Sequence, residues 1–406
     1  MKFGIIRERK SPPDKRVVFS PQTLAVLKEQ YPQAEIKVES SEVRIFKDEE
    51  YASAGFEVSN DMSDCDVLLG VKEVPIDHLV PGKKYFFFSH TIKKQQHNQK
   101  LLQAIIDKEI DLYDHEAIVD KNNKRLIGFG RYAGNVGTYN GFRAFGLKYE
   151  LFSLPKAETL PDKAALVARL KRQTLPPIKI VLTGMGKVGM GAKEILDAVK
   201  IKEVSVENFL SKNYDEPVYV QIDVLDYNKR KDVQKLDKQD FYDNPTQYVS
   251  DFGRFTKAAD MYIAGHFCGN DAPAIVTREM LRSPENRIKV VADISCDVDG
   301  PIACTSRAST IADPFYGYYP AEDREVDMHH PAAIVVMAVD NLPCELPRDA
   351  SEGFGEMFLN SVIPAFYNSD KEGVLERARI TNKGQLTPRF KYLKGYIQEK
   401  ENVPQL

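Results

Sequence analysis

Residues 178–199 constrain the fold more than any other part of the chain. An apolar run predicts a buried parallel strand, and Gly184, Gly186 and Gly189 then complete a G-x-G-x-x-G motif before a stretch of helical composition. In such a strand–turn–helix unit the glycines make a tight turn, admit a diphosphate close to the backbone and let the helix pack on the strand. A diphosphate would lie at the helix N-terminus, where the dipole favours an anion. The motif predicts a dinucleotide site; the alternative is a tight turn that binds no ligand.

The composition restricts the class of protein. A chain of 406 residues is long enough for two domains, and a net charge of −3 indicates neither a nucleic-acid partner nor a membrane surface. No apolar run reaches the length of a membrane span, and no signal peptide precedes the first charges. The five cysteines form no C-x-x-C pair, and no residues stand at metal-ligand spacing, so we expect no disulfide framework and no metal. A cytoplasmic location is the expectation, as a monomer or homodimer.

Strands that alternate with helices predict an α/β fold. Expected strands in the first half are residues 3–6, 35–39, 67–71, 84–89 and 110–113, and those in the second half are 178–183, 218–223, 261–264, 288–293 and 334–339. The segment 130–151 is interpreted as a turn and a helix that leaves the first domain, and a helix over 348–366 as one that returns to it. We therefore expect two Rossmann-like domains with mainly parallel sheets flanking an interdomain cleft: residues 1–140 with 345–406, and residues 141–344.

Three polar residues of the first half follow apolar strands directly: Lys72, His90 and Glu116. The carboxyl ends of strands in an open parallel sheet face the binding crevice, so these side chains should converge. A lysine there can act as a general base or hold a carboxylate, and histidine carries protons near neutral pH. The alternatives are a solvated lysine at a strand end and a histidine that caps the following turn.

Further polar residues are candidates for binding the substrate or the cofactor. Arg16 and Arg125 could each hold a carboxylate bidentately, or be ordinary surface arginines. Asp297 and Asp340 follow strands of the second half. Asp297 could line the nicotinamide side of the cleft or cap a helix, and the alternative for Asp340 is turn formation.

The acid that binds the cofactor ribose is either Asp223 or Asp226. The segment 200–217 places both further from the glycines than the usual spacing of about 20 residues. NAD is favoured as the cofactor. NADP stays open, because the basic residues 229–231 follow closely and a 2′-phosphate could lie near them.

The motifs together resemble a known family. Arg16, residues 70–73 (Gly-Val-Lys-Glu) and residues 88–91 (Phe-Ser-His-Thr) look like the N-terminal domain of alanine dehydrogenase and transhydrogenase, which saccharopine dehydrogenases share. The glycine-rich segment and residues 293–297 look like the second domain of that group. Within it, residues 112–116, 125–134, 340–343 and 346–351 resemble saccharopine dehydrogenase of the NAD-dependent, lysine-forming type and lysine–ketoglutarate reductase.

The resemblance implies roles for individual residues. It implies that Lys72 and His90 are an acid–base pair, and that Glu73 and Glu116 tune their charge and help to place the substrate. It implies that Arg16 and Arg125 bind substrate carboxylates and that Asp340 lies near substrate and cofactor. Asp297 matches a position that alanine dehydrogenases use beside their histidine. The implied reaction converts saccharopine, NAD and water to lysine, 2-oxoglutarate and NADH, or the reverse. The alternatives are an alanine dehydrogenase or related imine reductase and, in another class, a transhydrogenase-like or NAD-sensing module without amino-acid turnover.

Overall fold

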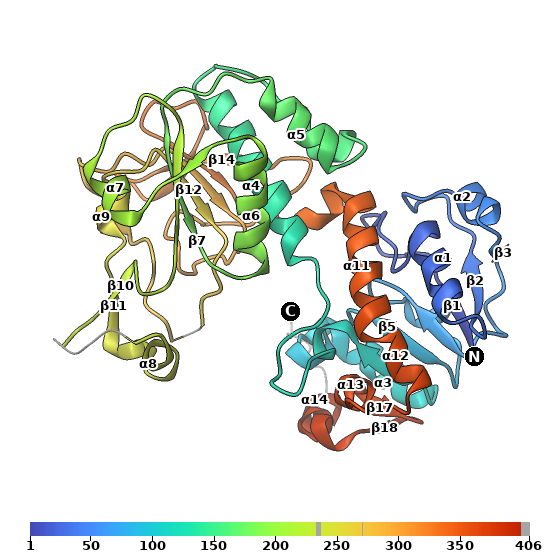
Figure 1. Cartoon of the computed structure of the whole chain (residues 1–406). Helices are drawn as coiled ribbons and strands as arrows, with labels where there is room; N and C mark the ends of the chain where they lie inside the picture. Colours follow the sequence, from blue (N-terminus) through green and yellow to red (C-terminus); the bar gives the residue numbers. More distant parts are fainter. Residues whose placement is uncertain (233–236, 270, 399–406) are drawn as a thin grey trace, which may run out of the picture. The chain divides into compact units, whose positions relative to one another are not determined.

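The computed structural model describes residues 1–232, 237–269 and 271–398. The chain divides into two compact units: unit 1 comprises Met1–Phe129 and Pro347–Leu406, and unit 2 comprises Gly130–Leu346 (Figure 1). The sequence analysis placed these divisions at 140/141 and 344/345. Residues 399–406, the end of the predicted segment 345–406, lie outside the described residues. None of the described helices is long and apolar enough to cross a membrane.

Unit 1 is built on a parallel sheet. Its described strands have the order β3-β2-β1-β4-β5-β6, and all neighbours run parallel. Their bounds are β1 Lys2–Ile5, β2 Glu35–Glu39, β3 Glu57–Ser59, β4 Val67–Leu69, β5 Lys84–Phe87 and β6 Asp111–Asp114. The strand order reverses between β1 and β4, which is where an open α/β sheet forms its binding crevice.

The helices of unit 1 come from both ends of the chain. They are α1 Pro21–Gln30, α2 Asp48–Ser53, α3 Gln99–Asp107, α11 Pro347–Ser361, α12 Ile363–Tyr367, α13 Val374–Ala378 and α14 Lys394–Gln398, with a small hairpin of β17 Thr381–Asn382 and β18 Gln385–Leu386. Ser20 caps α1, since its Oγ accepts a hydrogen bond from the Thr23 N–H at 3.2 Å. The predicted return of the chain through the helix near 348–366 is confirmed by α11 and α12.

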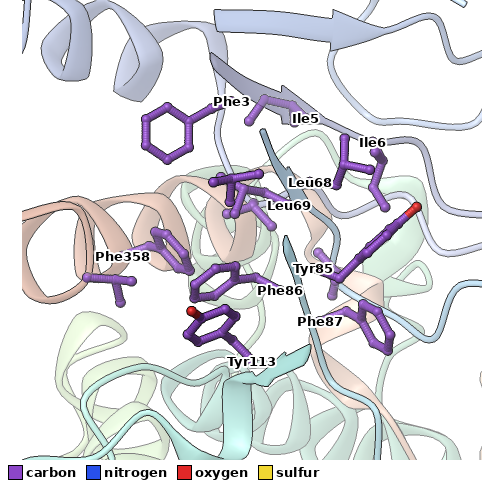
Figure 2. Close-up of a cluster of buried hydrophobic side chains, with 14 of the residues drawn as sticks. Phe3, Ile5, Ile6, Leu68, Leu69, Tyr85, Phe86, Phe87, Tyr113 and Phe358 are labelled. Carbon is purple, nitrogen blue, oxygen red and sulfur yellow. The ribbon is translucent and has the colours of Figure 1, made fainter. Parts of the chain in front are cut away.

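An aromatic core joins α11 to the sheet (Figure 2). Phe86 of β5 stacks on Tyr113 of β6 with ring centroids 4.4 Å apart, and Phe358 of α11 meets the Phe86 ring edge-on at 5.7 Å. Burial of such rings is the main stabilising contribution of this layer. It gives the carboxyl ends of β5 and β6 a rigid base.

Unit 2 contains a larger, mixed sheet. Its described strands have the order β15-β14-β16-β13-β12-β7-β9-β8, in which only β14 pairs antiparallel, with β15 and β16. Their bounds are β7 Lys179–Thr183, β8 Lys202–Glu203, β9 Val218–Ile222, β12 Met261–Ala264, β13 Val290–Asp293, β14 Phe315–Tyr319, β15 Arg324–Val326 and β16 Ile334–Met337. A separate hairpin pairs β10 Asn228–Arg230 with β11 Tyr248–Ser250.

The helices of unit 2 are α4 Gly130–Lys148, α5 Lys163–Lys171, α6 Lys187–Ala198, α7 Val206–Ser211, α8 Lys238–Asp243, α9 Gly253–Thr256 and α10 Arg278–Arg282. The helix interpreted as a connector, α4, packs closely on α6. A Cβ on Gly134 would lie 2.1 Å from the Val188 carbonyl oxygen, and one on Gly191 would lie 2.0 Å from the Arg131 carbonyl oxygen. Gly134 of α4 and Gly191 of α6 therefore allow the two helices to pack closely, which the sequence interpretation did not anticipate.

Candidate active site and cofactor pocket

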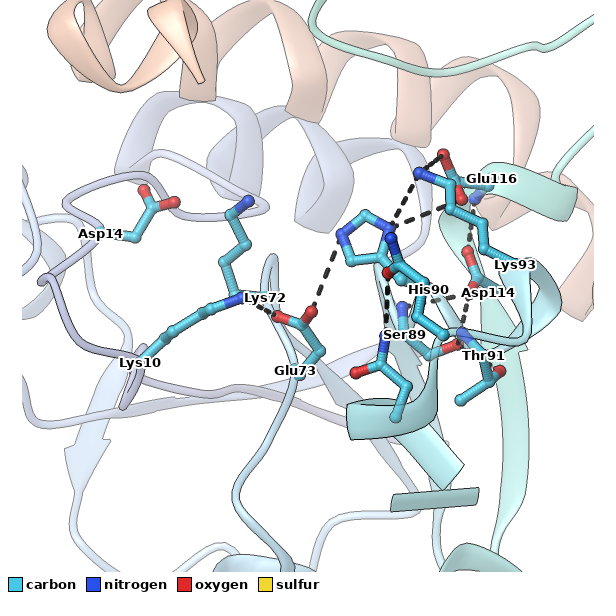
Figure 3. A network of polar contacts seen from close by, with 12 residues as sticks. Lys10, Asp14, Lys72, Glu73, Ser89, His90, Thr91, Lys93, Asp114 and Glu116 are labelled. Carbon is cyan, nitrogen blue, oxygen red and sulfur yellow. Dashed lines mark hydrogen bonds and ion pairs between the residues drawn. The ribbon is translucent and has the colours of Figure 1, made fainter. Parts of the chain in front are cut away.

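The polar residues predicted to converge in unit 1 do lie at one edge of its sheet (Figure 3). Lys72 comes three residues after β4, His90 three residues after β5, and Glu116 two residues after β6. These strands are parallel neighbours, so their carboxyl ends meet at the same edge. We call Lys72, Glu73, His90 and Glu116 the strand-end cluster.

His90 lies between two carboxylates. Its Nε2 is 3.8 Å from Glu73 Oε1, and its Nδ1 is 3.6 Å from Glu116 Oε2, so both contacts are ion-pair distances rather than hydrogen bonds (Figure 3). The residue adopts the left-handed conformation, with φ at 55°, and its side chain is 23% exposed. A partly exposed imidazole flanked by two acids is suited to moving a proton.

Glu116 is the best-paired acid of the cluster. Its Oε1 accepts a hydrogen bond from Arg125 Nη2 at 3.0 Å and lies 3.3 Å from Lys93 Nζ. Burial raises the pKa of this carboxyl, but His90, Arg125 and Lys93 together lower it to about 2. Glu116 is therefore a fixed negative charge at neutral pH.

Lys72 differs from its neighbours in having no ion pair or hydrogen bond to its ammonium group within the described part of the chain. Glu73 beside it is paired with Lys10 Nζ at 2.9 Å. The Lys72 backbone is held instead, because Glu8 accepts the Val71 and Lys72 N–H groups at 2.7 and 2.8 Å. The amine of Lys72 is thus the basic group of the cluster that remains open to a ligand.

Sequence reasoning missed Glu8, although its position three residues after β1 places it at the same sheet edge. Burial raises the pKa of Glu8 to about 8, against the effect of the two N–H groups that it accepts. Asp14 raises this pKa further, and Arg16 lowers it.

Asp114 is a second missed residue. Its carboxylate is fully buried and accepts the Ser89 N–H at 3.0 Å and the Glu116 N–H at 2.7 Å. Burial raises the pKa of Asp114. The Asp114 carboxylate ties the turn after β5 to the turn after β6, and so fixes the spacing of His90 and Glu116.

Arg16 is buried and bound to an acid of its own chain segment. Its Nε and Nη2 donate to the two carboxylate oxygens of Asp14 at 3.0 and 2.6 Å, and its guanidinium stacks 4.3 Å above the Phe129 ring. Arg125 is 56% exposed. Of the two predicted carboxylate clamps, Arg125 is the more accessible, and Arg16 already holds a carboxylate bidentately.

The glycine-rich segment forms the predicted strand, turn and helix from β7 into α6. Gly184 has φ at 99°, and a Cβ on it would lie 2.4 Å from the Gly265 carbonyl oxygen. A Cβ on Gly189 would lie 2.0 Å from the Gly184 carbonyl oxygen, so only glycine fits either position. Gly186 has no atom within 4 Å of its Cβ position, which leaves room for a ligand against the backbone.

A pocket of about 760 Å³ opens beside this turn, which is large enough for a dinucleotide. Its walls combine the turn, the ends of β9 and β12, and α8; they include Gly184, Gly186, Asp223, Tyr242 and His266. An open backbone turn, a helix N-terminus and an acid after β9 are the groups that a dinucleotide requires.

Asp223 and Asp226 have different surroundings. Asp223 lines the pocket, and its Oδ2 accepts a hydrogen bond from Lys238 Nζ at 2.6 Å. Asp226 Oδ2 accepts the Asp223 backbone N–H at 2.8 Å and is not part of the pocket wall. The geometry favours Asp223 as the ribose-binding acid.

The basic run 229–231 is engaged elsewhere. Lys229 pairs with Asp251 at 3.1 Å, Arg230 with Asp232 and Asp240, and Lys231 Nζ donates to the Thr246 carbonyl oxygen at 2.7 Å.

Asp297 and Asp340 are exposed residues that follow β13 and β16. The Asp297 carbonyl accepts the Gly300 N–H at 3.0 Å in a turn. Neither Asp297 nor Asp340 belongs to the pocket wall.

The five cysteines of the chain are all free.

Two family models match the chain, and the second match extends past residue 346 into the part of the chain that belongs to unit 1. Residues 4–136 match the model of the "Alanine dehydrogenase/PNT, N-terminal domain", and residues 170–391 match that of the "Alanine dehydrogenase/PNT, C-terminal domain".

Two curated relatives cover most of the chain. It is 29% identical to alpha-aminoadipic semialdehyde synthase of Arabidopsis thaliana, over 96% of this chain but only 41% of that protein. It is 25% identical to the NAD(+)-dependent, L-lysine-forming saccharopine dehydrogenase of Schizosaccharomyces pombe, over 92% of this chain and 95% of that protein. The chain therefore spans less than half of the first relative and nearly all of the second.

Among solved structures, the chain is similar to an L-alanine dehydrogenase, with a TM-score of 0.66 and 16% identity over 98% of this chain and 100% of the other. At that identity the similarity concerns the fold alone.

Proposed function

This chain belongs to the alanine dehydrogenase/PNT family, and we propose that it is an NAD-dependent amino-acid dehydrogenase acting on a C–N bond. We further propose saccharopine as its substrate: saccharopine, NAD⁺ and water give lysine, 2-oxoglutarate, NADH and a proton. Relatives that carry the names saccharopine dehydrogenase and alpha-aminoadipic semialdehyde synthase support this choice.

The observation that carries the proposal is the unpaired ammonium group of Lys72 within a cluster of paired charges. Every other charged member of the strand-end cluster lies within 4 Å of an opposite charge, whereas the Lys72 side chain has no such partner among the described residues. A group left in this way in a crevice is available to a substrate. A module that only binds a nucleotide would have no use for it.

Lys72, in its neutral amine form, accepts the proton of the substrate's secondary amine as the C–N bond is oxidised to an imine. The Gly184–Gly189 turn and Asp223 would hold NAD, which would supply the hydride acceptor. The chain's own contribution at this step is to hold the amine and remove its proton.

His90 takes the next proton. It deprotonates the water that attacks the imine carbon, and then returns the proton to the nitrogen as the C–N bond breaks and lysine leaves. Glu73 and Glu116, at 3.8 and 3.6 Å from its ring nitrogens, stabilise the imidazolium formed between these steps.

Substrate carboxylates are assigned to Arg16 and Arg125. Arg125 is exposed and reaches Glu116, so it can exchange part of that contact for a ligand carboxylate. Arg16 contributes a positive charge that Asp14 holds in place. Asp340 is assigned to substrate binding near the cofactor, as the family resemblance implies.

The test is NADH oxidation by the purified chain with 2-oxoglutarate plus lysine, and separately with pyruvate plus ammonia. Turnover with the first pair alone is the expected result. Turnover with pyruvate and ammonia alone contradicts saccharopine as the substrate and favours alanine dehydrogenase activity. Repeating the assay with NADPH decides between the two cofactors.

A further inference from the structure

The cofactor pocket contains a buried histidine that the proposed chemistry does not use. His266 follows β12 by one glycine, is 7% exposed and lines the pocket. Its backbone adjoins the glycine turn, because a Cβ on Gly184 would lie 2.8 Å from the backbone nitrogen of His266. The residue therefore stands beside the part of the turn that is expected to receive the diphosphate.

One ring nitrogen of His266 is held by the neighbouring strand. Nδ1 lies 2.9 Å from Thr183 Oγ1, at the end of β7, and Thr183 Oγ1 lies 3.0 Å from the Tyr262 hydroxyl. The other nitrogen, Nε2, is buried and has no hydrogen-bond partner among the described residues. A buried polar atom without a partner is costly, and a bound ligand is one way of satisfying it.

The hydrogen-bond chain determines the tautomer of His266. Burial raises the pKa of Tyr262, so its hydroxyl stays protonated, and within the described residues its acceptors are Thr183 Oγ1 and, at 3.4 Å, His266 Nδ1. If Nδ1 carried the proton and donated to Thr183, one of the two hydroxyl protons, that of Tyr262 or that of Thr183, would have no acceptor among these three groups. Nδ1 is therefore the acceptor, and Nε2 carries the hydrogen.

His266 is also a neutral donor. Burial lowers its pKa to about 4, so at neutral pH the ring is uncharged. Its Nε2–H needs an oxygen acceptor, and the anionic oxygens nearest to a glycine turn of this kind are those of a diphosphate.

We propose that His266 Nε2–H donates a hydrogen bond to a diphosphate oxygen of the cofactor, with Thr183 and Tyr262 fixing the ring for this purpose. The inference rests on the cofactor assignment of the proposed function, not on the identity of the amino-acid substrate. Because Nε2 is itself buried, a side chain of the pocket wall has to shift for a ligand oxygen to reach it.

Two variants separate the two nitrogens. In His266→Asn the amide replaces Nδ1 and keeps the contact with Thr183, and in His266→Gln it replaces Nε2. We expect His266→Asn to bind ADP about 10-fold more weakly than wild type, the usual effect of losing a hydrogen bond to a charged group. His266→Gln should stay close to wild type, and AMP, which lacks the diphosphate, should bind equally to all three, as measured by calorimetry.

Imidazole NMR of wild-type protein with labelled histidine provides a test that requires no variant to fold. ADP should shift the Nε2 resonance of His266. His115 is the matched control among the seven histidines: it is buried, its pKa is lowered to about 4, its Nδ1 lacks a partner among the described residues, and it lies in unit 1. Its resonances should not move.

Several outcomes would overturn the inference. An unshifted His266 resonance in the ADP complex, or equal weakening by the Asn and Gln variants, would do so. Equal weakening of AMP and ADP by His266→Asn would exclude the diphosphate as the acceptor. If wild-type protein binds neither ADP nor NAD, the cofactor assignment fails together with the inference. If wild-type protein binds both and His266→Asn binds ADP as tightly as wild type does, the inference alone fails.

Discussion

The strand-end cluster of unit 1 and the glycine turn of unit 2 prepare for ligands in opposite ways. The cluster consists of charged side chains held by one another, with His90 between Glu73 and Glu116. The turn consists of backbone and empty space, with Gly184 and Gly189 too crowded for any Cβ and Gly186 open. The first region should therefore respond to charge and pH, and the second to the addition of single carbon atoms.

The largest effect is expected from removing the proton carriers of the cluster. Lys72→Met and His90→Gln should each lower kcat by about 10²- to 10⁴-fold, the usual contribution of general acid–base catalysis. Binding of NAD, measured by calorimetry, should not change, because the cofactor pocket belongs to unit 2.

The control for this prediction is Lys10→Met, which removes an exposed partner of Glu73 in the same region and should leave kcat within a few-fold of wild type. Normal turnover in both Lys72→Met and His90→Gln would assign the cluster to structure. That result would favour the alternative in which the chain is a nucleotide-binding module without amino-acid turnover.

The buried acids of the two units provide the next largest effect, through pH. The pKa of Glu8 is raised in the folded state to about 8, so folding favours its protonated form. That contribution is complete below the unfolded pKa near 4.5 and is lost as the pH rises to about 8. Between pH 5 and 8 the free energy of unfolding should fall by on the order of 3 kcal/mol more in wild type than in Glu8→Gln, as measured by urea denaturation.

Glu345 of unit 2 is the matched acid for that experiment. It is 1% exposed, and burial raises its pKa to about 7, so Glu345→Gln should remove a smaller decline that ends one pH unit earlier. Identical pH dependence of stability in wild type and Glu8→Gln would contradict the role given to Glu8.

The same contrast explains what could be predicted from the sequence. Lys72, His90 and Glu116 are visible because apolar runs mark the strands, and parallel order brings the strand ends together. The three glycines are visible because their spacing is itself the signal. In both regions the sequence predicted these residues because each follows from the pattern of a single strand or a single turn.

The residues that were missed depend on contacts between distant segments. Glu8 matters because it accepts N–H groups of residues 71 and 72, and Asp114 because it joins two turns. His266 depends on Thr183 of a neighbouring strand. Asp223 and Asp226 could not be separated, because both follow β9 closely and only the structure shows that Asp223 lines the pocket. No local pattern in the sequence carries such information.

Single carbon atoms should separate the glycines of the turn. Gly189→Ala places a Cβ 2.0 Å from the Gly184 carbonyl oxygen, and the distorted turn should bind ADP about 100-fold more weakly. In Gly186→Ala the Cβ meets nothing, so the melting temperature should stay unchanged while ADP affinity falls about 10-fold through contact with the diphosphate. Unchanged ADP binding by Gly186→Ala would place the ligand elsewhere.

The smallest effect concerns Arg125, and it tests whether an exposed charge of the cluster serves the substrate or the fold. Its pair with Glu116 contributes under about 1 kcal/mol to stability, because the arginine is 56% exposed. Arg125→Gln should therefore leave the free energy of unfolding nearly unchanged but raise KM for 2-oxoglutarate about 10-fold, through loss of one charge-assisted hydrogen bond. Arg287 is a matched control in unit 2, since it is 53% exposed and its Nη2 lies 2.9 Å from Asp260 Oδ1. If Arg125→Gln and Arg287→Gln leave KM equally unchanged, Arg125 is an ordinary surface arginine and the second substrate carboxylate must be bound by another residue.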